Sequence, residues 1–247
     1  MRGTKRLERS VPVSHRPSEN LLLDALPEDA LERLTPHLEH VPMPVGRVLY
    51  ESGATVRDAW FPTSSIVSMH RLMENGSAAE VALIGPEGML DLSLFLGAER
   101  SNTEVSVQSA GHAFRMPARP LKEEFGRGGA LMQVLLRYTQ SFIAQMAQTA
   151  ACNRHGTLEQ RLCRWLLLNL DRMPSGELSM THELIANALG VRREGVSEAA
   201  GRLQRQGAIH YHRGHLSVLD RPVLESRACE CYRMDRRGAE RPLVMSR

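Results

Sequence analysis

The chain of 247 residues contains few aromatic residues, few cysteines and very little lysine. Aromatic residues make up 4% of the sequence, lysine occurs twice and cysteine four times. None of the cysteines forms a C-x-x-C pair, and four cysteines in a chain this long do not make a disulfide framework. We therefore interpret Cys152, Cys163, Cys229 and Cys231 as reduced thiols in the core or on the surface.

Several sequence signals of other protein classes are also missing. The chain has no apolar run long enough to span a membrane, and its basic N-terminus lacks the apolar core of a signal peptide. We expect a cytoplasmic protein with no membrane partner. No nucleophile elbow, P-loop or H-E-x-x-H motif is present, so we do not expect an enzyme.

The charge is unevenly distributed along the chain. Residues 153–247 contain 16 Arg, no Lys and 11 Asp or Glu, which gives a net charge of +5, whereas residues 1–152 carry −2. A basic C-terminal part points to a polyanionic partner. A general bias toward arginine would produce the same asymmetry, so charge by itself does not identify DNA.

In the first half of the chain, the sequence pattern changes from one typical of helices to one typical of strands. Apolar spacing predicts a helix over roughly residues 27–39, interrupted near Pro36. Over residues 41–116, short apolar segments alternate with turn residues, and Asn75-Gly76 is a hairpin signal between two of them. Short strands at regular intervals indicate an antiparallel barrel or sandwich.

A long helix is expected over residues 130–153. Its apolar positions follow alternating steps of four and three, which is the spacing of coiled coils. We assign this stripe to dimerisation; its members are Leu131, Leu135, Tyr138, Phe142, Gln145 and Thr149, followed by Cys152. A second stripe of small residues (Ala144, Ala147 and Ala151) lies nearby, so one side could pack on the barrel and another on a second copy. The alternative is a helix buried wholly within one chain.

The segment LSMTHELIANALGVRREGVSEAAGRLQRQGAI fits two helices joined by a tight turn. Thr181 is suited to cap the first helix, and Gly190 lies where the chain must leave that helix, a position that often needs positive φ. We expect the second helix at about residues 192–206. By their spacing, the residues of its core face are Val196, Ala199, Ala200 and Leu203.

The polar residues of the second helix are suited to reading DNA. A recognition helix enters the major groove with its N-terminal turns, where Arg193 can donate twice to guanine and Glu194 can accept from cytosine. The DNA-binding set that we expect is Arg192, Arg193, Glu194, Ser197, Glu198, Arg202, Arg205 and Arg213. Within it, Arg192, Ser197, Arg202 and Arg205 are expected to contact phosphates. Glu198 must find a cytosine, pair with an arginine or repel DNA. The alternative is a packing module with a salt-bridged outer face.

The segment AIHYHRGHLSVLD predicts two short strands around Arg213-Gly214. Such a hairpin is a wing, which would lie near the DNA backbone. His210, His212 and His215 could also approach phosphates. A metal site is the alternative for these histidines, but no carboxylate or thiol stands at a supporting spacing.

The short strands, the long helix and the two helices with their wing follow one another in the same order as in the Crp/Fnr superfamily of bacterial transcription regulators. The chain resembles this superfamily over roughly residues 20–222. The most specific match is LGVRREGVSEAAGRLQRQGAI followed by the wing. Arg193-Glu194 occupies the position that reads bases in cyclic-AMP-responsive members. Arg192 replaces the usual Ser or Thr, and Glu198 replaces a common arginine.

The resemblance implies an α+β fold. Its expected parts are an N-terminal antiparallel β-roll (a double-stranded β-helix, jelly-roll-like), a long dimerisation helix and a C-terminal winged helix-turn-helix. The domain boundaries that we expect are a flexible basic tail at 1–19, a cyclic-nucleotide-binding-like sensor β-roll at 20–129, the dimerisation helix at 130–153, the winged helix-turn-helix at 154–222 and a C-terminal tail at 223–247.

The same resemblance suggests an effector pocket formed by Asp91, Arg100 and Ser101. Nucleotide-binding members carry a Gly-Glu pair and then Arg-Ser or Arg-Thr around a short phosphate-binding helix. Here Arg100-Ser101 falls close to the second pair, but Asp91 follows Leu90 in place of Gly-Glu, so the acidic group is shorter and the glycine is absent. We therefore expect a repurposed or empty pocket, with a cyclic nucleotide as the disfavoured alternative, and we predict no cofactor.

We interpret the chain as a homodimeric, sequence-specific transcription regulator. Its expected partners are double-stranded DNA with a roughly palindromic site, a second copy of itself and RNA polymerase. The β-roll would sense an unknown effector or act as a scaffold. The competing interpretation is a protein that binds a cyclic nucleotide or another small molecule and whose C-terminal unit mediates protein contacts.

Overall fold

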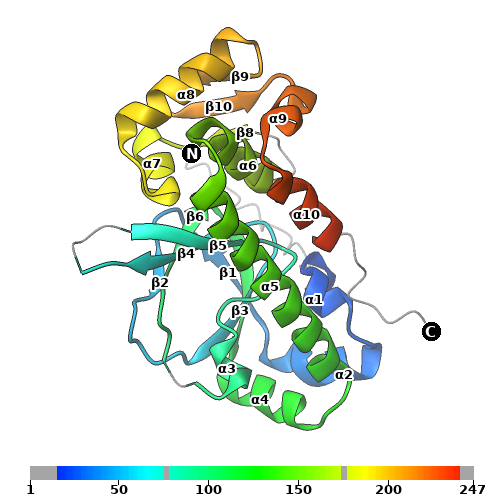
Figure 1. The fold of residues 1–247 in the computed structure, drawn as a ribbon. Helices are drawn as coiled ribbons and strands as arrows, with labels where there is room; N and C mark the ends of the chain where they lie inside the picture. The colour runs from blue at the N-terminus through cyan, green and yellow to red at the C-terminus, as the bar shows by residue number, and fades with distance from the viewer. Residues whose placement is uncertain (1–15, 75–77, 99, 174–176, 240–247) are drawn as a thin grey trace, which may run out of the picture.

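A computed structural model describes residues 16–74, 78–98, 100–173 and 177–239 (Figure 1). Short helices are followed by two antiparallel sheets, then by one long helix and then by a helical unit with a small sheet. The α+β fold expected from the sequence is confirmed. The first fifteen residues of the expected basic tail lie outside the described residues. Within the described part of the chain, no helix is both long and apolar enough to cross a membrane.

Short helices lead into the first sheet. They are η1 (Pro17–Glu19), α1 (Leu21–Asp24), α2 (Glu28–Leu34) and η2 (Thr35–His37). The helix predicted at 27–39 therefore ends early, because Pro36 has no N–H to continue the α-helical ladder and β1 already begins at Glu39. Asn20 caps α1 through its Oδ1, and its amide donates to the carbonyls of Pro62 and Gly88. This buried side chain joins the N-terminal helices to the β-roll.

Within the described residues, seven antiparallel strands form the β-roll. One sheet has the order β1-β7-β3 and the other has the order β2-β6-β4-β5. The strands are β1 (Glu39–Met43), β2 (Val48–Tyr50), β3 (Asp58–Pro62), β4 (Ile66–Leu72), β5 (Ala78–Ile84), β6 (Glu104–Ser109) and β7 (Gly111–Pro117). The predicted hairpin is consistent with the antiparallel pairing of β4 with β5, although the turn itself, residues 75–77, lies outside the described residues. Both sheets contribute apolar side chains to one core, which also receives residues from α5.

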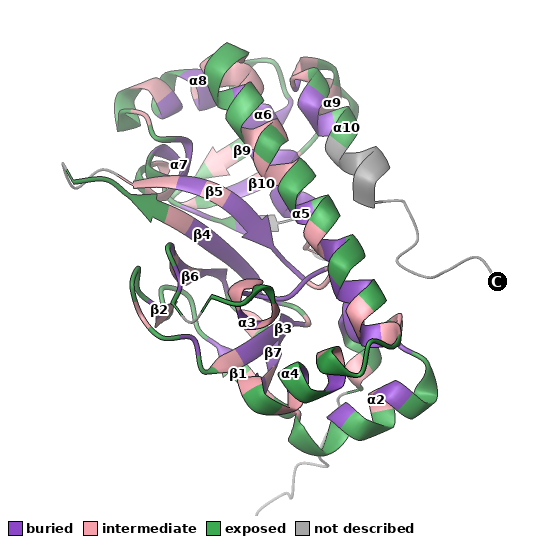
Figure 2. Ribbon diagram, turned by 60° about the horizontal axis from the view of Figure 1, so that its bottom comes forward, coloured by how far each residue is buried: buried purple, intermediate pink, exposed green. Residues whose placement is uncertain are grey.

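Helices α3 (Ser93–Leu96), α4 (Ala118–Gly126) and α5 (Ala130–His155) complete the first part of the chain. Figure 2 shows buried and exposed positions alternating along α5. The stripe that we assigned to dimerisation faces inward. Leu131, Leu135, Tyr138 and Phe142 are at most 6% exposed and belong to the core of the β-roll. Gln145 donates to the carbonyl of Leu83 on β5. These five side chains already have partners within their own chain, so the structure uses them for intramolecular packing and does not leave them free for a second copy.

The C-terminal unit contains α6 (Leu158–Leu170), β8 (Glu177–Ser179), α7 (His182–Leu189), α8 (Arg193–Arg205), β9 (Ile209–His212), β10 (His215–Val218), α9 (Arg221–Arg227) and α10 (Glu230–Ala239). Its strands form an antiparallel sheet with the order β8-β10-β9. The tail expected at 223–247 is helical up to residue 239, and α10 returns to pack beside α5 (Figure 1).

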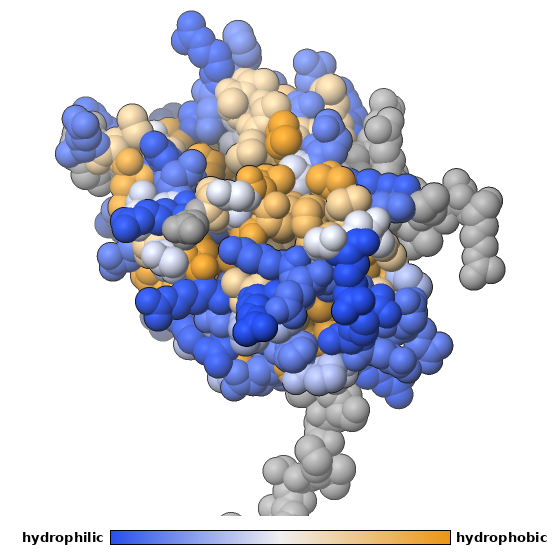
Figure 3. Space-filling model, turned by 90° about the horizontal axis from the view of Figure 1, so that it is seen from below, coloured by the Kyte–Doolittle hydropathy of each residue, from blue (hydrophilic) through white to orange (hydrophobic). Residues whose placement is uncertain are grey.

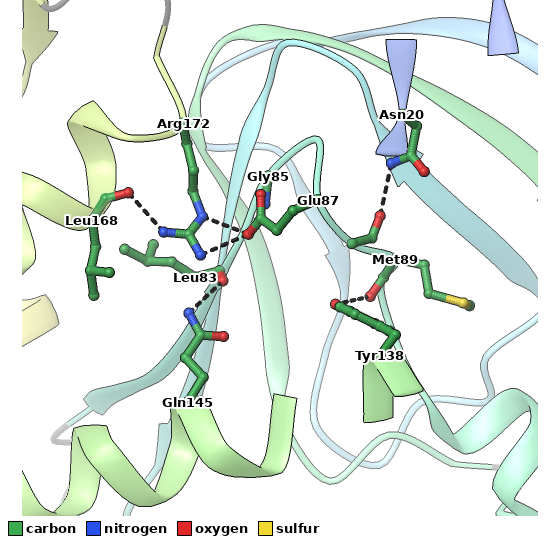
Figure 4. A network of polar contacts seen from close by, with 10 residues as sticks. Asn20, Leu83, Gly85, Glu87, Met89, Tyr138, Gln145, Leu168 and Arg172 are labelled. Carbon is green, nitrogen blue, oxygen red and sulfur yellow. Dashed lines mark hydrogen bonds and ion pairs between the residues drawn. The ribbon is translucent and has the colours of Figure 1, made fainter. Parts of the chain in front are cut away.

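Buried polar contacts join the C-terminal unit to the β-roll. On α6, Trp165 donates to Glu80 of β5 at 2.8 Å, and Asn169 accepts from Gln108 of β6. Just after α6, Arg172 binds the Glu87 carboxylate at 2.7 Å and donates to the carbonyl of Leu168 (Figure 4). Ile66 and Leu83 of the β-roll share an apolar cluster with α6 and α7. These contacts set the position of the helical unit on the β-roll.

Candidate DNA-binding surface

Helices α7 and α8 are joined by a turn with the expected chemistry. The Thr181 hydroxyl accepts from the N–H of Leu184 and so caps α7. Gly190 has φ 62° and ψ 41°, the left-handed conformation that ends α7 at little steric cost. Arg192 is the N-cap of α8 and makes no side-chain capping bond, consistent with its replacing a Ser or Thr. Helix α8 therefore begins within one residue of the position that the sequence predicts.

The core face of α8 is the one that its spacing indicates. Val196, Ala199, Ala200 and Leu203 are all at most 3% exposed. At Gly195, an added Cβ would lie 2.9 Å from Cδ2 of Leu158, so the missing side chain lets α8 approach α6 closely. Burial of this face fixes which side chains of α8 remain in solvent. Those include Arg193, Glu194, Ser197 and Glu198, all of which are exposed.

Ser197 has local partners that the sequence did not reveal. Its hydroxyl lies 2.9 Å from Nδ1 of His182 and donates to the carbonyl of Arg193. The His182 ring stacks on Tyr211 of the wing, with ring centroids 4.2 Å apart. Burial, and then the positive charge of Arg193, lower the pKa of His182, which favours a neutral ring. Ser197 thus fastens α8 to the start of α7 in addition to facing solvent.

Glu198 and Arg202 pair with each other along α8. The Arg202 guanidinium contacts Glu198 at 2.7 Å and Glu159 of α6 at 3.0 Å. Glu159 also binds Arg227 of α9 at 2.9 Å. Arg202 and Arg227 lower the pKa of the Glu159 carboxyl, the Arg202 hydrogen bond contributing most. Arg202 is therefore already neutralised by two carboxylates, and we withdraw it from the expected phosphate contacts. Of the three fates foreseen for Glu198, pairing with an arginine is the one observed.

The wing is a tight hairpin next to α8. Arg213 and Gly214 have φ of 47° and 85°, and two successive positive values are typical of a type I′ turn. The N–H of Tyr211 donates to the side chain of Gln204, which ties the wing to α8. The hydroxyl of Tyr211 donates to the carbonyl of Met180. Arg213 is held at the exposed tip, on the same unit as α8. The side chains of His210, His212 and His215 are also exposed.

Four arginines on α8 and the wing are exposed and make no ion pair within the described residues. They are Arg192 and Arg193 at the start of α8, Arg205 at its last residue and Arg213 at the tip of the wing. Cationic side chains that remain unpaired in solvent are suited to phosphates and base edges. Across the ranges that the structure describes, no group of three His, Cys, Asp or Glu side chains is arranged to hold a metal ion.

The three residues of the expected effector pocket do not form one contact set. Arg100 is exposed and donates to the carbonyl of Gly53, while Ser101 is buried and donates to the carbonyl of Thr103. Asp91 is 6% exposed, with φ 59°, and its Oδ1 accepts from the N–H of Ser93. The Arg100 guanidinium is thus on the surface, whereas the Asp91 carboxylate is buried.

A polar group that sequence reasoning missed lies inside the β-roll beside Asp91. The Tyr50 hydroxyl, Oδ2 of Asp91 and Oγ of Ser93 are buried and have no hydrogen-bond partner in the described part of the chain. Burial, and then the charge of Asp91, raise the pKa of Tyr50 well above its usual range. Tyr50 is 41 positions before Asp91 in sequence, so no local pattern connects them.

An antiparallel β-roll, a long helix and a winged helix-turn-helix together define a class of DNA-binding regulators. Residues 160–227 match the family model of the Crp-like helix-turn-helix domain. No curated protein sequence matches the chain.

Solved structures with the same fold cover most of the chain. A Crp/Fnr-family transcriptional regulator from Eubacterium rectale has 17% identity and a TM-score of 0.68, and the match covers 85% of this chain and 98% of that one. FixK2 from Bradyrhizobium japonicum has 15% identity and a TM-score of 0.67, with 78% and 98% covered. The c-di-GMP responsive global regulator CLP from Xanthomonas campestris has 14% identity and a TM-score of 0.64, with 78% and 99% covered.

At these identities the structural matches show the fold, and the domain match shows the helix-turn-helix. The chain therefore has the fold of solved Crp/Fnr-family regulators and contains a Crp-like helix-turn-helix domain. Its Crp-like helix-turn-helix domain contains α7, α8 and the wing.

Proposed function

We propose that the chain is a homodimeric, sequence-specific DNA-binding regulator in which α8 reads bases in the major groove. The observation that carries the proposal is the solvent-facing start of α8. Arg193 and Glu194 stand there on a helix whose opposite face is buried. A rigid, packed helix with polar side chains on its first turns is the geometry by which helix-turn-helix proteins reach base edges.

The exposed side chains divide into two roles. Arg193 can donate to O6 and N7 of guanine, and Glu194 can accept from N4 of cytosine, so these two residues would specify sequence. Arg192, Arg205 and Arg213 would contact phosphates, which fix the register of the protein on DNA without reading bases. Arg202 instead holds α8 on α6 through Glu159.

The second face of α5 supports a dimer. Leu136, Gln140, Ile143 and Ala147 follow steps of four, three and four along the solvent-facing side, and we call them the outer stripe. Leu136 is 46% exposed and Ile143 is 51% exposed, although both are large and apolar. Figure 3 shows apolar residues gathered in the upper part of the face seen there, above a hydrophilic lower part. The steps are those of a coiled-coil seam, so two copies of α5 could pair along this stripe.

A dimer of this kind places two copies of α8 for one DNA duplex. Twofold symmetry in the protein implies a twofold-symmetric site, with half-sites separated by about one helical turn, roughly 34–36 Å. RNA polymerase remains a further partner that we propose from the superfamily resemblance.

Selection from random double-stranded DNA tests this function. We expect an enriched, roughly palindromic site whose binding persists at salt concentrations that remove nonspecific complexes. Ile143→Glu should shift the protein toward the monomer in sedimentation and weaken binding to the full site, while Thr139→Ser on the same helix serves as a conservative control. If no symmetric site is enriched, the chain is not a regulator of this kind.

The β-roll is proposed as a scaffold or as a sensor of an effector other than a cyclic nucleotide. Arg100, the cation expected to hold a phosphate, points to Gly53 and solvent, while a carboxylate occupies the interior. The buried carboxylate of Asp91 would repel a cyclic phosphate. We expect titration calorimetry with cyclic AMP and cyclic GMP to show no micromolar binding. Binding that is lost in Arg100→Ala would overturn this view.

A further inference from the structure

Three of the four cysteines gather where α5 meets α10. Cys152 lies in the last turns of α5, Cys229 lies between α9 and α10, and Cys231 lies in the first turn of α10. The Sγ atoms of Cys152 and Cys229 are 2.9 Å apart, although the two residues are 77 positions apart in the sequence. All four cysteines of the chain are free thiols in this structure. The fold therefore brings two reduced sulfur atoms into direct contact.

The surroundings of this pair favour reaction at Cys229. The hydrogen bond with Cys152 lowers the pKa of Cys229, against the opposing effect of burial, and Cys231 and the Arg164 guanidinium lower it further. The same hydrogen bond and burial raise the pKa of Cys152, so Cys152 keeps its proton. Arg164 is only 6% exposed, and its positive charge lowers the pKa of both Cys152 and Cys229. Cys229 is half-buried and therefore within reach of a small oxidant.

Cys163 provides an internal contrast. It lies in the middle of α6, is 0% exposed and packs in the apolar cluster of the C-terminal unit. Burial raises the pKa of the Cys163 thiol to about 12. A thiol without a neighbouring sulfur or an access route does not react readily with oxidants.

We propose that Cys152 and Cys229 form a peroxide-sensitive dithiol switch that fixes the connection between α5 and the C-terminal unit. The Cys229 thiolate attacks one oxygen of a hydroperoxide, the O–O bond breaks, and a sulfenic acid forms as hydroxide or alkoxide leaves. The Cys152 thiol then attacks the sulfenic sulfur, the S–O bond breaks, and water leaves as the disulfide forms. The peroxide takes up the two electrons that the sulfur atoms lose.

Little movement is needed to close this bond. A disulfide has an S–S distance of about 2.05 Å, so the sulfur atoms must approach each other by roughly 0.9 Å from their separation of 2.9 Å. Thiols or a reduced dithiol reductant would reverse the step by exchange.

A disulfide between Cys152 and Cys229 would restrict movement of the helix-turn-helix domain. Cys152 lies four residues before Gly156, where the chain leaves α5, and the N–H of Gly156 donates to the carbonyl of Cys152 at 2.8 Å. Cys229 follows α9, where the chain leaves the helix-turn-helix domain. A bond between them would join the two connections of that domain and enclose α6 to α9 in one covalent loop. Reorientation of the domain about Gly156 would then be restricted.

Peptide mapping of the full chain after treatment with hydrogen peroxide tests the chemistry. We expect a Cys152–Cys229 disulfide that disappears on addition of dithiothreitol. Because cleavage at arginine leaves Cys229 and Cys231 in one peptide, the mapping is done in Cys231→Ser as well as in the native chain. Cys163→Ser should form the bond as the native chain does, whereas Cys229→Ser should not. Sulfinic acid at Cys229 with Cys152 still alkylatable, or a bond that excludes Cys152, would overturn the proposal.

The effect on DNA binding rests on the proposed function and has its own readout. Two copies of α8 must adjust together to one duplex, so we expect oxidation to weaken binding to the selected site by about tenfold, with no change in Cys152→Ser. Unchanged binding by the oxidised native chain would show that the bond does not restrict the domain, which contradicts the switch. If the reduced chain binds no specific DNA, the proposed function fails. The switch is then tested by hydrogen exchange at residues 149–157. Slower exchange after oxidation supports the switch, and unchanged exchange refutes it.

Discussion

The start of α8 and the contact between α6 and the β-roll use charged and polar side chains in opposite ways. At the start of α8, Arg192 and Arg193 face solvent and make no ion pair within the described residues. At the α6 contact, Arg172 binds Glu87, and Glu80 accepts from Trp165. Paired polar groups position one part of the molecule on another, whereas unpaired ones remain available to a partner. The difference supports the proposal that the exposed end of α8 is the DNA-binding surface.

The loop that follows β5 organises the paired region. Figure 4 shows Glu87 meeting Arg172, while the nearby carbonyl of Met89 accepts from the Tyr138 hydroxyl of α5 at 2.9 Å. An added Cβ at Gly88 would lie 2.4 Å from that hydroxyl, so only glycine allows α5 to approach so closely. One loop thus contacts both α5 and the segment after α6.

Loss of Arg172 should have the largest effect on stability. The Arg172 and Glu87 side chains are 11% and 31% exposed, and Arg172→Ala would leave Glu87 without its ion-pair partner. We expect the free energy of unfolding to fall by about 2–3 kcal/mol, less than the loss of about 3–5 kcal/mol for a fully buried pair, because Glu87 is partly exposed. Denaturant titration measures it, with Arg193→Ala as the control that should change stability by less than about 0.5 kcal/mol. If both variants lost the same free energy of unfolding, the contrast between paired and unpaired arginines would be wrong.

Glu80 makes the paired region sensitive to pH. Burial raises the pKa of Glu80 to about 7, although hydrogen bonds from Ser68 and Trp165 oppose the shift. The folded chain therefore holds this proton more tightly than the unfolded chain, and stability falls as pH rises from about 4.5 to about 7. Glu80→Gln cannot ionise, so we expect it to gain about 2–3 kcal/mol relative to the native chain between pH 4.5 and 8. Parallel stability curves for the two proteins would contradict this.

Local sequence patterns predicted the helix-turn-helix well. The cap at Thr181, the left-handed Gly190 and the buried face of α8 each depend on residues within a few positions of one another. Such features follow from backbone chemistry that the sequence displays directly. The bounds of α8 consequently differ from the expected range by one residue at each end.

Contacts between distant segments could not be predicted in this way. The charge of Arg202 and its place on α8 suit a phosphate contact, but Glu159 of the neighbouring helix α6, 43 positions away in the sequence, binds its guanidinium. On α5, coiled-coil spacing indicated an apolar stripe correctly, but spacing cannot tell whether a β-roll or a second helix covers that stripe. The pairs Tyr50 with Asp91 and Cys152 with Cys229 likewise depend on the folded topology.

The central claim is that Arg193 reads a base while the arginines around it do not. The most direct measurement is the affinity of Arg193→Ala for the selected site and for single-base variants of it, at two salt concentrations. We expect a loss of about 1–3 kcal/mol and relaxed preference at one base pair in each half-site. Arg205→Ala should weaken all sequences alike, and Arg202→Gln should leave base preference unchanged. If Arg193→Ala also weakens every sequence equally, Arg193 contacts phosphate and α8 does not read DNA as proposed.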